Sequence, residues 1–126
     1  MPAFNRVQLI GNLGKDPETR FTPTGKKVCT FSIAVDRRWK SSEGETKDAT
    51  DWFSIEAWDH LGEICQKYLV KGSLVFIEGR LRNDRYEHEG EIRYRTRVIA
   101  SHLQMLDRKP SEEEEEAVSE EESAPE

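Results

Sequence analysis

The chain has 126 residues, about the size of one domain, and 35% of them are apolar while another 35% are charged, so its core is small. It contains no run of the roughly 18 apolar residues that a membrane helix needs, and no basic segment leading into an apolar one as in a secretory signal. Cys29 and Cys65 form neither a C-x-x-C pair nor a metal-ligand spacing. We therefore expect a cytoplasmic protein with two buried thiols.

Charge is distributed unevenly along the chain. Residues 111–126 hold nine glutamates and no Lys or Arg, so residues 1–110 carry 19 basic and 16 acidic side chains, a net charge of +3, although the whole chain has −6. We expect a folded domain at 1–108 and a disordered acidic tail at 109–126, because like charges repel and the tail has little to bury. The tail is either a solubilising segment or a mobile anion that interacts with a basic surface or a partner.

Turn residues, among them Asp16-Pro17 and Pro23-Thr24-Gly25, separate the predicted elements. The polar stretches 40–50 and 83–91 each contain a glycine and are predicted as long loops. Alternation of apolar and polar residues, clearest around Phe31, indicates half-buried strands. Strands are predicted at residues 4–13, 27–38, 51–58, 73–82 and 92–106.

One helix is predicted, at residues 59–70, where apolar residues recur at spacings of three, four, seven and eight. Asp59 is its expected N-cap, and Gly72 is expected to stop it. Three strands, a helix and two strands predict an all-β domain with one helix. The layout is that of the oligonucleotide-binding (OB) fold, a five-stranded Greek-key barrel capped by the helix between strands three and four. A five-stranded open sheet is the alternative, because periodicity does not reveal closure.

Two tryptophans lie on the unexpected face of the strand predicted at 51–58. Side chains alternate across a strand, so the apolar residues at 53, 55 and 57 share one face, while Trp52 and Trp58 share the other with Ser54 and Glu56. Large aromatic residues of a half-buried strand normally point inward. Either these rings pack under a loop or in a subunit interface, or they form a platform on which nucleobases stack.

Other aromatic and basic residues favour the stacking platform. Trp39 lies in a polar, basic stretch at the end of the second strand, and Tyr86 lies near Arg82 and Arg85 in a predicted loop. The arginines at 93, 95 and 97 alternate and therefore share one strand face. That face is either a groove that follows a phosphate backbone or a solvated surface with cross-strand ion pairs to acids such as Glu78.

Signals of catalysis and of metal binding are weak. The three histidines are scattered, and the sequence contains no G-x-S-x-G elbow, P-loop or G-x-G-x-x-G. Gly11-Asn-Leu-Gly14 matches the G-x-x-G loop of KH domains, but it lies in a predicted strand without flanking helices. We expect no enzyme, no metal and no cofactor.

Several segments resemble the bacterial single-stranded DNA-binding protein (SSB) family in sequence and in order. Together they extend over nearly all of residues 4–106. They are residues 5–21 (NRVQLIGNLGKDPETRF), Thr50-Asp-Trp52, Tyr68-Leu-Val-Lys-Gly72, Ile77-Glu-Gly-Arg-Leu-Arg82 and Gln104-Met-Leu106.

The resemblance implies an OB-fold homotetramer, associated with the nucleoid, that binds single-stranded DNA without sequence preference and protects it in replication, recombination and repair. Trp58 stands where phenylalanine is common in the family and Tyr86 where tryptophan is common, but both keep an aromatic face. The family's stacking positions are matched by Trp39, Trp52, Trp58 and Tyr86, and its backbone-contacting positions by Arg6, Arg20, Lys71, Arg82 and Arg85.

The tail differs from the family pattern. Family members end in acidic residues followed by an apolar Pro-Phe tip that docks on partner enzymes, whereas this chain ends Ser123-Ala-Pro-Glu126. Recruitment of replication and repair proteins would then rely on the charge of the tail.

Two other functions are compatible with the exposed aromatic and basic residues: an OB module for protein assembly, such as a primosomal replication protein, and an RNA-binding OB domain.

Overall fold

The computed structural model describes residues 2–107, so the acidic tail expected at 109–126 lies outside the described residues. Six strands and one helix are present in this part of the chain. They are β1 (Val7–Leu13), β2 (Glu18–Phe21), β3 (Lys27–Lys40), β4 (Thr46–Trp58), α1 (Asp59–Tyr68), β5 (Leu74–His88) and β6 (Glu91–Met105).

The sheet closes into a barrel, which confirms the predicted OB fold and excludes the open sheet. The strand order is β1-β5-β6-β4-β3-β2, and β1 also pairs with β3 through Asn12↔Ala34 and Leu13↔Ile33. Five strands therefore form the closed barrel, with β2 added beside β3. The parallel β4–β6 pairing is short, because only Ile55↔Val98 and Glu56↔Ile99 pair there.

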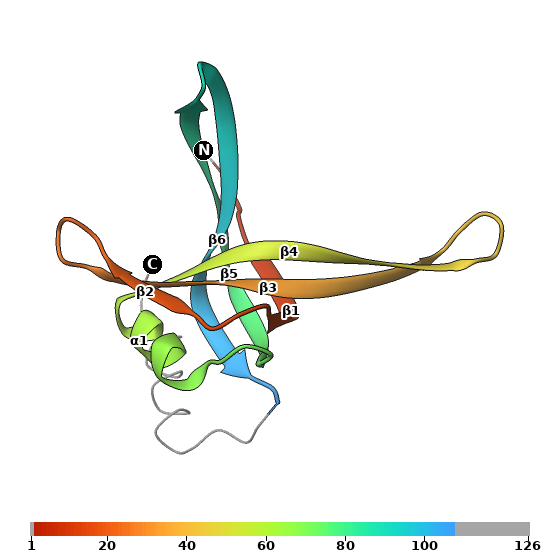
Figure 1. The fold of residues 1–126 in the computed structure, drawn as a ribbon, viewed down its shortest axis with the longest axis horizontal. Helices are drawn as coiled ribbons and strands as arrows, with labels where there is room; N and C mark the ends of the chain where they lie inside the picture. Colours follow the sequence, from red (N-terminus) through yellow and green to blue (C-terminus); the bar gives the residue numbers. More distant parts are fainter. Residues whose placement is uncertain (1, 108–126) are drawn as a thin grey trace.

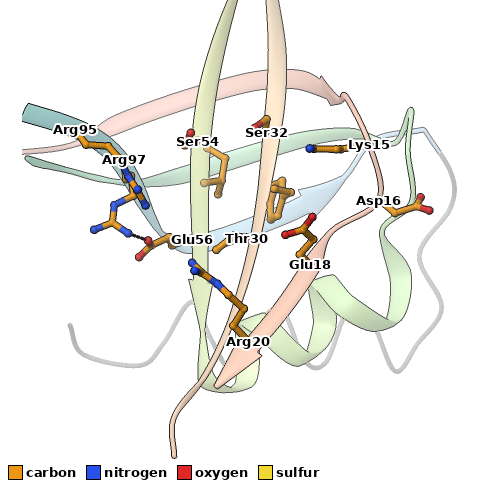
Figure 2. Close-up of a pocket in the computed structure, with 12 residues that line it drawn as sticks. Lys15, Asp16, Glu18, Arg20, Thr30, Ser32, Ser54, Glu56, Arg95 and Arg97 are labelled. Carbon is orange, nitrogen blue, oxygen red and sulfur yellow. Dashed lines mark hydrogen bonds and ion pairs between the residues drawn. The ribbon is translucent and has the colours of Figure 1, made fainter. Parts of the chain in front are cut away.

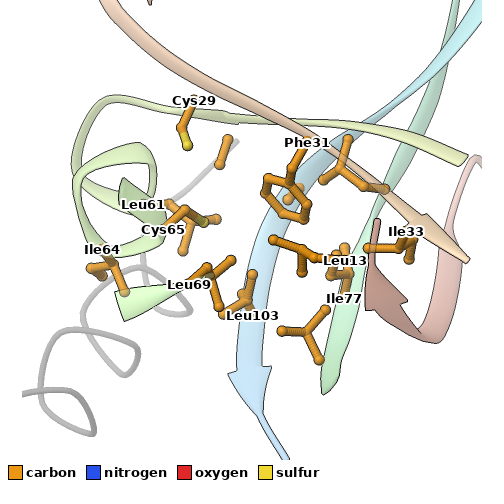
Figure 3. Packing of buried hydrophobic residues seen from close by; sticks show 14 of the residues in the cluster. Leu13, Cys29, Phe31, Ile33, Leu61, Ile64, Cys65, Leu69, Ile77 and Leu103 are labelled. Carbon is orange, nitrogen blue, oxygen red and sulfur yellow. The ribbon is translucent and has the colours of Figure 1, made fainter. Parts of the chain in front are cut away.

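The barrel interior is filled by apolar side chains from every barrel strand and from α1 (Figure 3). The predicted inward residues of β3, from Cys29 through Phe31 to Ile33, are buried, and so is Ile55 of β4. The apolar face of α1 packs against β3 and β4, as its periodicity predicted. Burial of this face against the barrel, rather than intrinsic propensity, holds such a short helix in place.

Both cysteines are free and buried, as expected. Burial raises the pKa of the Cys29 thiol, because the charged thiolate would lose its hydration inside the barrel. Cys29 is therefore a neutral thiol at physiological pH and packs as a small apolar side chain.

The two long loops predicted at 40–50 and 83–91 are instead the ends of two extended hairpins. β3 and β4 pair without interruption from Val28↔Trp58 to Lys40↔Thr46, and β5 and β6 pair out to His88↔Glu91. Figure 1 shows both hairpins projecting from the barrel as arms. The prediction failed because each arm is a two-stranded ribbon with water on both faces, so its backbone pairs without the apolar alternation of a core strand.

Two local predictions also need correction. Residues 18–21 between the predicted turns form β2, a four-residue strand that pairs with β3 from Glu18↔Thr30 to Phe21↔Lys27. Asp59 is the first residue of α1 rather than its N-cap, because Trp58 occupies the cap position in extended conformation and makes no side-chain capping bond. The helix therefore begins directly at the end of β4, without a linker.

Candidate nucleic-acid interface

The outer face of β4 carries two tryptophans separated by polar residues. Trp52 is 60% exposed and Trp58 is half-buried, so neither ring belongs to the core. Six residues of extended strand place them about 20 Å apart. Ser54 lies between them, opposite Ser32 of β3. Two aromatic rings thus flank a strip of hydroxyl-bearing side chains on the barrel surface.

The Trp52 ring lies against the backbone at Gly14, directly after β1. A Cβ atom at Gly14 would come within 2.5 Å of the indole ring. The N–H of Gly14 donates to the carbonyl of Ser32, 3.1 Å away, which fixes this backbone beside β3. Glycine is therefore needed here because it leaves room for the ring, and Gly14 holds Trp52 over the outer face of the sheet.

Replacing Gly14 by alanine is expected to displace the Trp52 ring while leaving the barrel folded, because the atoms in conflict belong to a movable side chain. The measurement is tryptophan emission in a W39F/W58F background, in which Trp52 is the only remaining tryptophan. We expect the emission to shift to longer wavelength with an unchanged far-ultraviolet circular dichroism spectrum. An unchanged emission maximum would contradict the contact between Gly14 and Trp52.

A groove of about 230 Å³ crosses this face of the barrel (Figure 2). Its floor includes Thr30, Ser32 and Ser54, and a second hollow continues it past Arg20 to Phe21 and Trp58. The basic side chains that line the first groove are Lys15, Arg20, Arg95 and Arg97. The carboxylates of Asp16, Glu18 and Glu56 also line it. The groove therefore combines hydroxyl groups with four basic and three acidic side chains on the face of the barrel that carries the two tryptophans.

These cations fall into two classes. Lys15, Arg20 and Arg95 form no ion pair with any residue between 2 and 107. Arg97, in contrast, is bound by two carboxylates, those of Glu56 and Asp84. Other ion pairs of arginines include Arg6–Glu78 (2.6 Å), Arg37–Asp51 (3.0 Å), Arg38–Asp48 (2.7 Å), Arg82–Asp84 (3.3 Å), Arg82–Glu56 (3.9 Å) and Arg93–Glu91 (3.5 Å).

The arms carry the remaining candidate aromatic residues. Trp39 lies in β3 near the end of one arm, with the guanidinium of Arg37 4.8 Å from its ring centroid. Tyr86 lies in β5 on the other arm, opposite Arg93. The four predicted stacking residues therefore do not form one cluster: two are on the barrel and one is on each arm.

The predicted backbone-contacting residues are also spread over the surface. Arg20 lines the groove. The backbone N–H of Lys71 donates to the carboxylate of Asp16, a lining residue, at 2.8 Å. Arg85 pairs with Tyr94 and directly precedes Tyr86 in β5. Its side chain therefore lies on the face of the arm opposite to that of Tyr86. The structure brings Arg20 and Arg82 to the groove and its extension but places Arg85 on the other face of the arm, and Lys71 lines neither hollow.

Three exposed residues were missed by the sequence reasoning. Phe21 is 70% exposed and lines the same hollow as Trp58. It was overlooked because β2 was not predicted, although its aromatic character beside Arg20 was a signal. Lys15 lines the groove, and Tyr94 is exposed on the β5–β6 arm.

Residues 2–107 contain no group of three or more His, Cys, Asp or Glu side chains that could hold a metal ion. Within the same range, α1 is the single helix, and it is too short to cross a membrane.

The geometry agrees with what comparisons with known proteins show. The model of the single-strand binding protein family matches residues 4–106. The chain belongs to this family. This range includes all six strands and the helix described above. The family assignment therefore applies to the barrel and to both of its arms.

Known SSB proteins resemble the chain in sequence and in structure. It is 41% identical to single-stranded DNA-binding protein 1 of Chlorobaculum tepidum over 110 residues, which are 86% of this chain and 68% of that protein. It is 39% identical to a single-stranded DNA-binding protein of Neisseria meningitidis over 82% of this chain, but spans only 60% of that relative. A Plasmodium falciparum SSB in complex with single-stranded DNA superposes with a TM-score of 0.80 at 31% identity, covering 85% of this chain and 98% of the other.

Proposed function

We propose that this SSB family member binds single-stranded DNA without sequence preference and protects it in replication, recombination and repair. The observation that carries the proposal is the groove on the face of Trp52 and Trp58, whose lining includes three cations, Lys15, Arg20 and Arg95, that form no ion pair with any residue between 2 and 107. Unpaired bases stack on such rings, each contributing about 1–3 kcal/mol, and the basic side chains neutralise phosphates. Duplex DNA is disfavoured because its bases are already stacked and paired.

Within this proposal, the two tryptophans of β4 form the primary platform, and Ser32, Ser54 and Thr30 offer hydroxyl groups to the strand between them. Trp39 and Tyr86 extend the path onto the two arms. Because a hydroxyl group both donates and accepts hydrogen bonds, it accommodates any base, which supports binding without sequence preference. Of the five predicted backbone-contacting cations, Arg20 and Arg82 line this path. DNA contacts of all five, Arg6, Arg20, Lys71, Arg82 and Arg85, stay predictions.

The test is tryptophan fluorescence during titration with a deoxythymidine oligomer, repeated with a duplex of equal length. We expect strong quenching by the single strand and little by the duplex. Without quenching by the single strand, the protein-assembly module becomes the better proposal. Competition between DNA and RNA strands of matched sequence then tests the RNA-binding alternative, which predicts that RNA binds at least as tightly.

We further propose a homotetramer, as the resemblance to SSB implies. One edge of β1 supports self-association, because before Asn12 its residues pair with β5 only and leave the opposite edge without a partner strand among residues 2–107. Exposed Ile10 lies on this strand. Sedimentation equilibrium measures the mass directly, and a monomer would overturn this proposal. A cytoplasmic, nucleoid-associated location stays a prediction.

Ending the chain at Pro110 is expected to tighten DNA binding at low salt. The change removes nine glutamates and leaves a domain of net charge +3, so less negative charge competes with DNA for the basic groove. Dissociation constants at two salt concentrations check this, because the difference should shrink as salt screens the charges. A full-length variant with the nine glutamates changed to glutamine is the matched control. Equal or weaker binding by both variants would reject competition by the tail.

A further inference from the structure

A buried carboxylate lies at the centre of the groove. Glu56 belongs to the outer face of β4, yet it is only 2% exposed. Its Oε2 accepts a hydrogen bond from the guanidinium of Arg97, and its Oε1 accepts one from the indole N–H of Trp58 at 3.1 Å. One carboxylate thus contacts both a proposed stacking residue and an arginine of the opposite strand.

Asp84 and Arg82 complete a network of four charges. Arg97 also pairs with Asp84, while the Nη2 of Arg82 lies 3.3 Å from Asp84 and 3.9 Å from Glu56. The two acids and two arginines sum to zero net charge. All of these contacts lie where the β5–β6 arm leaves the barrel, next to the short parallel pairing at Glu56↔Ile99. The network therefore connects β4 to both strands of the arm.

The arginines of this network are not equivalent to their neighbours. The side chain of Arg97 is 14% exposed and has two carboxylate partners, whereas Arg95 is exposed and has no ion pair among residues 2–107. Figure 2 shows Arg97 reaching Glu56, with Arg95 beside it and Arg20 rising from β2 on the other side. Removing one partner of a buried ion pair is strongly unfavourable, because the remaining charge stays buried and uncompensated. A phosphate that drew Arg97 away from Glu56 would leave the Glu56 carboxylate buried without its partner, so the phosphate contact would have to offset that unfavourable free energy.

We propose that Arg97 and Arg82 are positioning residues that do not bind phosphate. Held by Glu56 and Asp84, they fix the β5–β6 arm against the barrel and, through Glu56, the indole of Trp58. Phosphate neutralisation in the groove is left to Lys15, Arg20 and Arg95. This assignment rests on the proposed binding of single-stranded DNA, and it gives Arg82 a role other than the backbone contact that the family resemblance implied.

The salt dependence of binding separates the two roles. Each phosphate neutralised on a single strand contributes about −0.7 to the slope of log K against log salt. R95Q is expected to flatten the slope by about 0.7, because one phosphate contact is lost. R97Q is expected to weaken binding similarly at every salt concentration and leave the slope unchanged. Equal flattening by R95Q and R97Q would overturn the assignment.

A second readout follows Trp58 itself. In a W39F/W52F background, R97Q is expected to shift the emission of the remaining Trp58, whereas R95Q is not, because Arg97, unlike Arg95, shares a carboxylate with the indole. An emission spectrum that is identical in both variants would contradict the positioning role.

R97Q risks unfolding the protein because it leaves Glu56 buried without its main partner. The double variant E56M/R97M removes both charges and substitutes apolar side chains of similar length, a change that buried ion pairs often tolerate. Its slope should equal that of the unmodified chain, while a slope flattened by about 0.7 would identify Arg97 as a phosphate ligand. The proposed function fails separately, if the unmodified chain shows no salt-dependent affinity for single-stranded DNA.

Discussion

Replacing Trp52 by alanine is expected to weaken binding to single-stranded DNA by roughly 5- to 150-fold, the equivalent of one stacked base at about 1–3 kcal/mol. The ring is 60% exposed and rests on Gly14 rather than in the barrel interior, so its loss should leave the fold intact. Dissociation constants for a labelled deoxythymidine oligomer measure the loss, and thermal unfolding of the same sample checks stability.

Two matched variants define what Trp52 contributes. W52F keeps an aromatic face at the same position and should retain most of the affinity. W39A removes a ring that lies on an arm beside Arg37, and we expect it to cost less than W52A, because Trp39 lies outside the groove. Unchanged affinity in a folded W52A variant would mean that the ring has a structural role, such as packing in a subunit interface.

Replacing Gly79 by alanine is expected to give the largest loss of stability. A Cβ atom there would lie 2.1 Å from the carbonyl oxygen of Ile99 and 3.0 Å from the Cα of Ala100, which are backbone atoms of the paired strand β6. The register of β5 and β6 also shifts between Glu78 and Gly79, so the conflict falls at an irregularity that bends the barrel wall. Overpacking of this kind costs at least about 1–3 kcal/mol.

For a domain of this size, that loss lowers the Tm by roughly 4–20 °C, which scanning calorimetry measures directly. G14A is the matched control, because the same substitution there meets a movable indole ring instead of backbone. We expect G14A to unfold much closer to the Tm of the unmodified protein. A Tm of G79A equal to that of G14A would show that β6 yields to the added methyl group.

The alternation of residues along β3 and β4 was enough to predict most of the side chains that these strands bury. Phe31 and Ile33 are in the core and Trp52 is outside it, because a period of two fixes the face of each residue within one strand. The spacing of apolar residues likewise predicted α1. The order of short motifs along the chain then indicated the family, whose model matches residues 4–106.

Contacts between distant strands were decided by the tertiary structure alone. Closure of the barrel depends on the pairing of β1 with β3 at Leu13↔Ile33. The length of the arms depends on strands that pair with water on both faces. Neither kind of pairing produces a periodic pattern of apolar residues in the sequence. Glu56 was expected on the solvent side of β4, but Arg97, 41 residues further along the chain, covers it. Local periodicity reports the face of a single strand, whereas burial of that face depends on which other strand crosses it.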